Sequence, residues 1–297
     1  MRVIEEVRPR VFVLENVEGL AFADKDEGLR LVLKRIEQVN RRAGCSYKPV
    51  YRVLNAANYG VPQMRERLIL VAARDGTEFK FPAETHAEDP ADDSALEPWR
   101  TAWDALADVK PASNEDLALK GKWASLLPSI PEGQNYLFHT PEGHGLPLFG
   151  WRTRYWSFLL KLAKNRPSWT IPAQPGPSIG PFHWENRRLS MRELCRLQTF
   201  PDDVQIEGGR TAIQRQLGNA VPSLLAEVLA REIRVQLLGL PALTGAAKLL
   251  PAKQPEVPRR FPVRAVPAEF EKYKGAHKPH PGVGRGPGAT AQLKAAV

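Results

Sequence analysis

One carboxylate in this sequence has the setting that catalysis needs. An apolar run over residues 11–14 ends in Glu15, and Asn16 follows directly. Functional groups in open α/β sheets collect where strands end at the carboxyl edge, so Glu15 is well placed for a site. A single carboxylate at a strand end is more commonly a helix cap or a surface turn residue. Glu15 alone does not decide between these roles.

Two arginines in "QMRERL" form a second candidate group. Arg65 and Arg67 are alternate residues of an expected strand, and alternate side chains point to one face. Their guanidiniums would then project together toward a phosphate or a carboxylate. A solvated basic strand edge explains the same pattern equally well. The segment "GNAVP", further along, is in the same way compatible with a simple tight turn before a helix.

Four segments in their order are far more specific than any one of them. They are "ENV", "NYGVPQMRER", "RRLSMRELCRLQTFPDD" and "QLGNAVP", with a long insert between the second and the third. Together they resemble the second half of the DNA cytosine-C5 methyltransferases, and the resemblance covers about residues 1–240. It implies a partial Rossmann-like methyltransferase catalytic domain of the α/β class plus a smaller, irregular target-recognition domain.

The resemblance also implies a mechanism. A target cytosine is flipped out of the duplex, because its ring cannot be reached within the stack. A cysteine thiolate attacks C6, and C5 then takes a methyl group from S-adenosylmethionine. Glu15 should bind the N3 and amino edge of the base as a general acid. Arg67 should reach the base's O2 or the adjacent phosphate, and Arg65 should brace the site. The cofactor-binding stretch should be Asn219, Ala220 and Val221.

Two elements of the family pattern are not found. The family's Pro-Cys nucleophile and its Gly-rich cofactor loop both lie upstream of "ENV", and neither occurs in these 297 residues. Cys45 and Cys195 are expected to be structural thiols. We therefore expect a C-terminal portion with an incomplete S-adenosylmethionine pocket, inactive without an N-terminal complementing chain. A truncated product and a non-catalytic DNA-binding module are the alternatives.

The elements that position the first segments have clear periodicity. A helix is expected at the chain start, then a fully buried parallel strand over residues 11–14. A helix over residues 27–42 presents the apolar stripe Leu29, Val32, Leu33 and Ile36 and ends at Gly44. Strands follow around residues 50–54 and 68–72. Ser190 with Glu193 predicts a capping box, and a final helix begins at Pro222.

The domain limits expected from this pattern are 1–80 for the C-terminal part of the catalytic domain and 81–185 for the target-recognition domain. Residues 186–240 should hold the end of the recognition domain and the helix that returns to the catalytic domain, and 241–297 a basic, Pro- and Gly-rich, disordered tail. The recognition region should contact double-stranded DNA. Arg152 and Arg154 are the candidates for guanine edges, and Lys161, Lys164 and Arg166 for phosphates. The aromatics Trp151, Tyr155, Trp156 and Phe158 are expected to form a small core.

Composition limits the remaining possibilities. Lys and Arg exceed Asp and Glu by 42 − 33 = 9, which favours a polyanionic partner. Two cysteines make a disulfide framework improbable, and the sequence holds neither a membrane span nor a signal-peptide pattern. We expect a cytoplasmic protein of a restriction-modification context, with no metal and no membrane partner.

Overall fold

The computed structural model of the chain describes residues 1–17, 27–150 and 155–275. It divides into two compact units, which we call the first and the second unit. The first unit holds Met1–Arg100, Cys195–Gln205 and Ala220–Lys253. The second unit holds Thr101–Leu194, Ile206–Asn219 and the chain from Gln254 onward. The segments "ENV" and "QMRER" therefore belong to the first unit.

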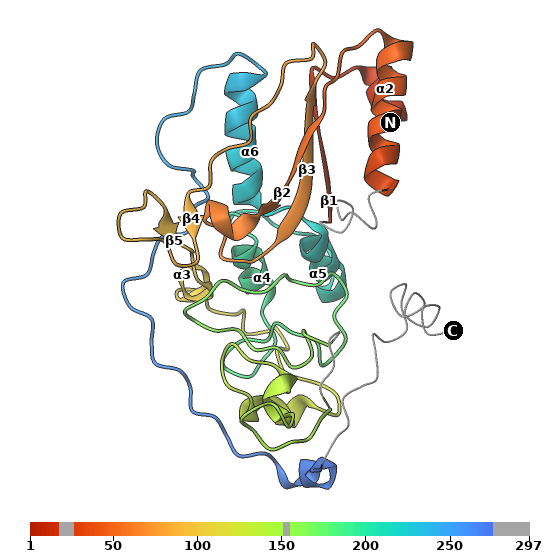
Figure 1. Cartoon of the computed structure of the whole chain (residues 1–297). Coiled ribbons are helices and arrows are strands. Elements are labelled where there is room, and N and C mark those ends of the chain that lie inside the picture. The colour runs from red at the N-terminus through yellow and green to blue at the C-terminus, as the bar shows by residue number, and fades with distance from the viewer. Residues whose placement is uncertain (18–26, 151–154, 276–297) are drawn as a thin grey trace, which may run out of the picture. The chain divides into compact units, whose positions relative to one another are not determined.

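A three-stranded sheet organises the first unit. Its strands are β1 (Val11–Val17), β2 (Val50–Asn55) and β3 (Glu66–Ala73), in the order β1-β3-β2 (Figure 1). β3 runs antiparallel to both neighbours. The prediction of a parallel strand at residues 11–14 is wrong for the described residues, because β1 pairs there only with β3. β1 and β2 do share one direction, without being neighbours.

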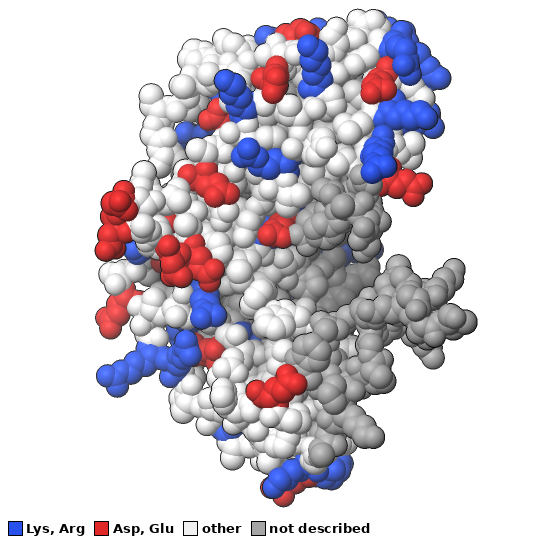
Figure 2. Space-filling model, in the orientation of Figure 1, with Lys and Arg blue, Asp and Glu red and all other residues white. Residues whose placement is uncertain are grey.

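One face of the sheet is covered by a helix that the sequence predicted well. Helix α2 (Glu27–Ala43) packs Leu29, Ile36 and Val39 with Leu68 and Leu70 of β3. Gly44 follows in the left-handed conformation, with φ at 64°, and ends the helix as expected. α2 also carries Arg30, Lys34, Arg35, Arg41 and Arg42, and Figure 2 shows basic side chains gathered where Figure 1 places α2. The short α1 (Arg2–Val7) contributes Ile4 to the same core.

The other face of the sheet packs against α6 (Ser223–Gln236). Ile69 and Val71 of β3 form a core with Leu224 and Leu225 of α6 and with the 3-10 helix η2 (Ala56–Tyr59). Val13 of β1 pairs in register with Val71, so it points to this face, yet it is 44% exposed. The prediction that residues 11–14 are fully buried is therefore wrong, because β1 is an edge strand of the described sheet.

The second unit has little regular structure, as predicted for the insert. It contains the helices α3 (Ala102–Leu106) and α5 (Arg210–Asn219) and the 3-10 helices η3 (Ala124–Ser129), η4 (Tyr136–His139) and η5 (Ala268–Tyr273). Its core is built from side chains of these turns and of the loops between them. The fully or nearly buried members are Leu126, Leu127, Ile130, Tyr136, Leu148, Leu159, Phe182 and Phe270.

Two of the expected domain limits need correction. The first unit extends to Arg100, because the short strands β4 (His86–Ala87) and β5 (Glu97–Pro98) belong to it. Disorder was predicted for everything after residue 240, and this is wrong for residues 241–275. Leu249 and Leu250 pack on the first unit's core, and Phe270 stacks on Trp123 of the second unit at 5.5 Å.

The later motifs fold partly as expected. The capping box of α4 (Met191–Leu197) is present, since Glu193 N–H donates to Ser190 Oγ and Ser190 N–H to Glu193 Oε2. Helix α5 was missed, because "QLGN" was interpreted as a turn. The segment "QLGN" instead forms the end of α5, where a Cβ on Gly218 would lie 2.3 Å from Ala173 Cα. Glycine is needed there for close helix–loop packing.

Candidate active site

Glu15 and Arg67 form an ion pair across two strands. The β1–β3 register pairs Glu15 with Ile69 and Val17 with Arg67, so Glu15 and Arg67 are diagonal neighbours on one face of the sheet. Glu15 Oε1 lies 2.8 Å from Arg67 Nε. The Glu15 side chain is 28% exposed and the Arg67 side chain 11% exposed. The pair is desolvated on the arginine side and open on the carboxylate side.

Arg67 is held from a second direction. Its Nη1 donates to the carbonyl of Glu66 at 2.7 Å, while Nε faces Glu15. Hydrogen bonds that involve an ionised donor are short and strong, and two of them fix the plane of a guanidinium. Arg67 therefore has a defined orientation, and it restricts the carboxylate of Glu15 in turn.

Arg65 is fully buried beneath this pair. Its Nη2 donates to the carbonyl of Ala220 at 2.8 Å. Burial is the largest cause and repulsion from Arg67 the second, and together they lower the pKa of Arg65 to about 10. The carboxylate of Glu15 raises this pKa by a smaller amount. The guanidinium remains charged at neutral pH. It ties the start of β3 to the residues that lead into α6. Its bracing role in a catalytic site stays a prediction.

Three further polar residues fix the backbone of the first unit, and the sequence reasoning gave them no role. Asn55 Oδ1 accepts from the N–H of Ala57 at 3.1 Å and from the N–H of Arg65 at 3.3 Å. Gln63 is fully buried and donates to the carbonyl of Leu197 at 3.1 Å. Thr199 Oγ1 accepts from the N–H of Leu224. Gln63 opens the Gln-x-Arg-x-Arg segment, and this was the available signal for it.

The predicted cofactor stretch has three different environments. The carbonyl of Ala220 accepts from Arg65, and Val221 packs on the core of the first unit. Asn219 is the last residue of α5, and its side chain is exposed. At the end of β1, Asn16 Oδ1 accepts from the N–H of Val17 at 2.8 Å. The structure thus brings Glu15 to Arg67 and Arg65 to Ala220.

The cysteines have the environments expected of structural thiols. Cys195 is buried within α4, and Cys45 is half-buried after the end of α2. No group of metal-ligating side chains with the number needed for an ion occurs among residues 1–17, 27–150 and 155–275. In the same residues, no helix is long and apolar enough to cross a membrane.

The basic residues predicted to contact DNA do not share one environment. Lys161 and Lys164 are each 3% exposed. Lys161 donates to the carbonyl of Ile130, and Lys164 Nζ lies 2.6 Å from Glu132 Oε1. Assigning these two lysines to phosphates is corrected, since an ammonium enclosed by the protein cannot reach a phosphate. Arg166 is exposed and remains a candidate.

The remaining candidates of this region lie at or near residues outside the described ranges. Trp151, Arg152 and Arg154 are among these residues. Phe158 packs on the core of the second unit as predicted. Tyr155 and Trp156 are 51% and 47% exposed. The prediction that they belong to a small aromatic core is therefore wrong.

The sequence relationships identify the class of protein. Residues 1–235 match the sequence model of the C-5 cytosine-specific DNA methylases, and the chain belongs to that family. It is 39% identical over 251 residues to the type II methyltransferase M.SacI of Streptomyces achromogenes, covering 80% of this chain and 63% of that protein. It is 35% identical over 238 residues to the type II methyltransferase M.NgoFVII of Neisseria gonorrhoeae, covering 78% and 60%.

The chain thus spans about three fifths of the length of these relatives. A solved structure of a prophage-encoded DNA modification methyltransferase from E. coli is similar at a TM-score of 0.48. It has 21% sequence identity, and the similarity covers 80% of this chain and 72% of that one.

Proposed function

We propose that the chain is the C-terminal catalytic and recognition part of a DNA cytosine-C5 methyltransferase of a restriction-modification system. The reaction is methyl transfer to C5 of a cytosine flipped out of double-stranded DNA. The observation that supports this best is the Glu15–Arg67 pair at 2.8 Å, with its carboxylate partly open and its arginine enclosed. Family membership over residues 1–235 supports the reaction class.

In this proposal Glu15 binds the N3 and amino edge of the flipped cytosine. Its carboxyl group holds a proton at N3 as the ring gains electrons, which is general-acid assistance. Arg67 keeps the carboxylate in one orientation, because it is itself fixed by Glu66. Arg67 also presents positive charge where the base's O2 or its phosphate would lie. Arg65 holds β3 against the 219–221 stretch through Ala220.

The cofactor has a partial site in this stretch. S-adenosylmethionine supplies the methyl group when it is bound. The exposed Asn219 side chain and the backbone N–H groups of Ala220 and Val221 fit one wall of a site for its polar groups. The carbonyl of Ala220 already accepts from Arg65, so it is not available for this role. The rest of the pocket and the nucleophile would come from an N-terminal segment or a separate complementing chain.

The edge of the sheet supports the need for such a partner. Among the described strands, β1 pairs only with β3, and its other edge has no neighbour. Val13 and Val17 on β1 are 44% and 55% exposed. An unpaired edge with exposed apolar side chains favours association with another strand. We therefore propose that the isolated chain has no methyltransferase activity.

The proposed role of Glu15 is tested in a mixture with an N-terminal fragment of the same family that carries its cysteine. Glu15→Gln should lower turnover at least about 100-fold, a typical contribution of a general acid. Its affinity for duplex DNA should stay within about threefold of the parent value, because one uncharged polar side chain replaces another of the same shape. Glu66→Gln on the same strand is the matched control, since Glu66 is exposed. Comparable losses of turnover and of binding in Glu15→Gln would mean that Glu15 is structural.

A further inference from the structure

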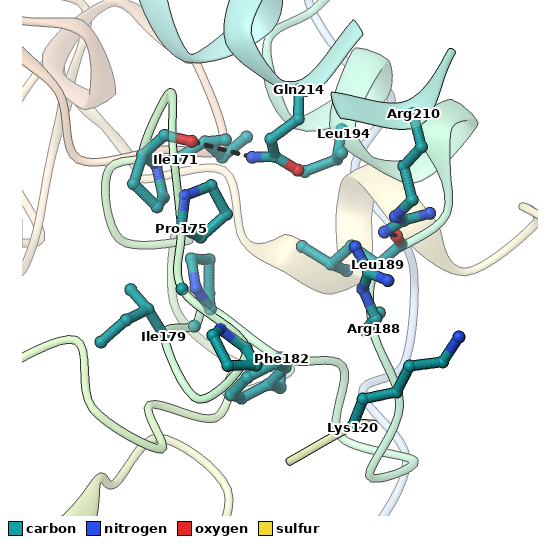
Figure 3. Close-up of a pocket in the computed structure, with 15 residues that line it drawn as sticks. Lys120, Ile171, Pro175, Ile179, Phe182, Arg188, Leu189, Leu194, Arg210 and Gln214 are labelled. Atoms are coloured by element: carbon teal, nitrogen blue, oxygen red, sulfur yellow. Dashed lines mark hydrogen bonds between the residues drawn. The ribbon is translucent and has the colours of Figure 1, made fainter. Parts of the chain in front are cut away.

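The second unit contains a cavity to which the sequence analysis gave no role, although Arg188, Leu189 and Leu194 of the third family segment line part of it. Its volume is about 230 Å³, which is below the roughly 300–1,000 Å³ of pockets for drug-sized ligands. Figure 3 shows Pro175, Ile179 and Phe182 along one side, and Arg188 and Arg210 on the other. The cavity therefore combines an apolar wall with a basic wall.

The apolar wall of this cavity is held by a hydrogen bond and by close backbone packing. Gln214 of α5 donates to the carbonyl of Pro172 at 2.8 Å, the contact drawn in Figure 3. Gly218 of α5 packs on the backbone of Ala173, and Gly180 packs so closely that a Cβ would lie 2.2 Å from the carbonyl oxygen of Leu160. The loop that forms the apolar wall is thus fixed at three points. A preformed cavity loses little free energy to ordering when it binds.

Arg210 is fixed in the basic wall by its own partners. Its Nη1 lies 2.8 Å from Glu115 Oε1, and its Nη2 donates to the carbonyl of Leu189 at 2.5 Å. Burial is the largest cause that lowers the pKa of Arg210, and repulsion from the charge of Arg188 is the second. The two guanidiniums are therefore close enough to repel each other.

Arg188 differs from the other cations of the cavity. Lys120 Nζ at the rim lies 2.7 Å from Asp116 Oδ2, and Arg210 is paired with Glu115. In the described parts of the chain, the guanidinium of Arg188 forms no ion pair and no hydrogen bond. Two carboxylates thus face three cations, which leaves one positive charge for a single anionic group. An anion beside Arg188 would also relieve its repulsion with Arg210.

We propose that this cavity holds one sugar-phosphate unit of a DNA strand, with the phosphate on Arg188 and the deoxyribose against Pro175 and Ile179. The inference rests on the proposed function, because that function supplies DNA as the polyanion. The small volume excludes a whole cofactor of drug size, while the apolar wall suits the carbon face of a sugar. Contacts of this kind set the position of a protein on DNA and do not read its sequence.

The test is equilibrium binding of the full chain to mixed-sequence duplex DNA, measured by fluorescence anisotropy between about 50 and 200 mM salt. Arg188→Gln should raise Kd about tenfold at the low-salt end, and it should reduce the slope of log Kd against log salt by about 0.9, the value for one lost phosphate contact. Arg264→Gln is the control for charge, because Arg264 is an exposed arginine of the same unit outside the cavity. It should change Kd less than about twofold.

A second variant tests the sign of the effect. Asp116→Asn removes the carboxylate that faces Lys120 and should lower Kd about two- to threefold, because a rim cation becomes available to DNA. The proposal is overturned if Arg188→Gln and Arg264→Gln behave alike, if Asp116→Asn weakens binding, or if the parent chain does not bind duplex at about 50 mM salt. Displacement of the duplex by a low concentration of a deoxynucleoside monophosphate would assign the cavity to free nucleotides and would overturn it too.

These outcomes are separate from the test of the proposed function. Methyl transfer that depends on Glu15, together with an unchanged affinity in Arg188→Gln, would reject only the cavity. A clear effect of Arg188→Gln on binding without any methyl transfer in the complemented mixture would reject only the methyltransferase function.

Discussion

The two units use buried positive charge in opposite ways. In the first unit Arg67 is enclosed, but its partner carboxylate, Glu15, is partly open to solvent. In the second unit Lys164 is enclosed together with its carboxylate, and both side chains are less than 5% exposed. The first arrangement leaves its carboxylate accessible, whereas the second buries both charged side chains.

This difference shows that a basic residue in a region predicted to bind DNA is not by itself a predictor of a DNA contact. Lys161 and Lys164 were predicted to bind phosphates, yet both lie inside the second unit. The segment around Arg259–Phe261 covers Lys164, through the carbonyl of Arg259 and the N–H of Phe261 on Glu132. Arg188 lies in the third family segment but was given no role from the sequence, and it lines a cavity, which is the setting that a phosphate contact needs.

The largest effect on stability is expected from Glu132→Gln. It leaves the ammonium of Lys164 buried without its carboxylate, and breaking a buried pair from one side costs roughly 3–5 kcal/mol. Urea unfolding followed by tryptophan fluorescence measures the change. Asp116→Asn is the control, since both partners of the Lys120–Asp116 pair are more than half exposed and such pairs contribute about 0–1 kcal/mol. Equal losses in the two variants would show that the Lys164–Glu132 pair is not shielded from water.

A smaller loss is expected from Gly218→Ala at the end of α5. The added methyl group would lie 2.3 Å from Ala173 Cα, and overpacking of this kind costs about 1–3 kcal/mol. Gly44→Ala, where no atom lies within 4 Å but φ is 64°, separates crowding from backbone strain. If Gly218→Ala has the stability of the parent chain, then α5 does not pack closely on the 172–173 loop.

The smallest effect is a dependence of stability on pH through His183. Burial lowers the pKa of His183 to about 4, against the opposing influence of Glu193, while the unfolded side chain has a pKa near 6.5. The folded state binds fewer protons, so stability is full above about pH 6.5 and falls as the pH drops toward 4. Between pH 7 and 5.5 the loss is roughly 1 kcal/mol from this group.

The environment of His183 supports this direction. Its Nδ1 accepts from the N–H of Glu185, and its Nε2 lies 3.6 Å from Glu193 Oε1. Burial raises the pKa of Glu193, but the hydrogen bonds from Arg187 and Ser190 and the charges of His183 and Arg187 together outweigh it, so this pKa is lowered. His183→Gln should flatten the pH profile of the urea midpoint between about pH 6.5 and 5.5. An unchanged profile would place the titrating group elsewhere.

The first unit could be predicted from the sequence much better than the second. The helix over residues 27–42 and the strands that became β2 and β3 have periods that follow from burying one face. The roles expected of Glu15 and Arg67 came from motif position, and the structure brings the two side chains together. Their chemical roles remain proposals. The antiparallel pairing of β1 was missed, since a local pattern does not contain the direction of its neighbour.

The second unit has no comparable period. Its core is assembled from turns and from distant segments, such as Phe270 stacked on Trp123, and local spacing does not predict such contacts. The burial of Lys164 depends on a segment almost a hundred residues later in the chain. Helix α5 was missed because Gly218 and Asn219 are typical of turns. Here the glycine is needed because the 172–173 loop leaves no room for a side chain.

The central proposal is that this chain supplies the Glu15 half of a methyltransferase site and that an N-terminal partner supplies the other half. The most direct measurement is the transfer of labelled methyl from S-adenosylmethionine to mixed-sequence duplex DNA by the chain alone, by an N-terminal family fragment with its cysteine, and by their mixture. Incorporation should occur only in the mixture, and Glu15→Gln should abolish most of it. Clear incorporation by the chain alone, or equal incorporation by the mixture with and without Glu15, would contradict the account.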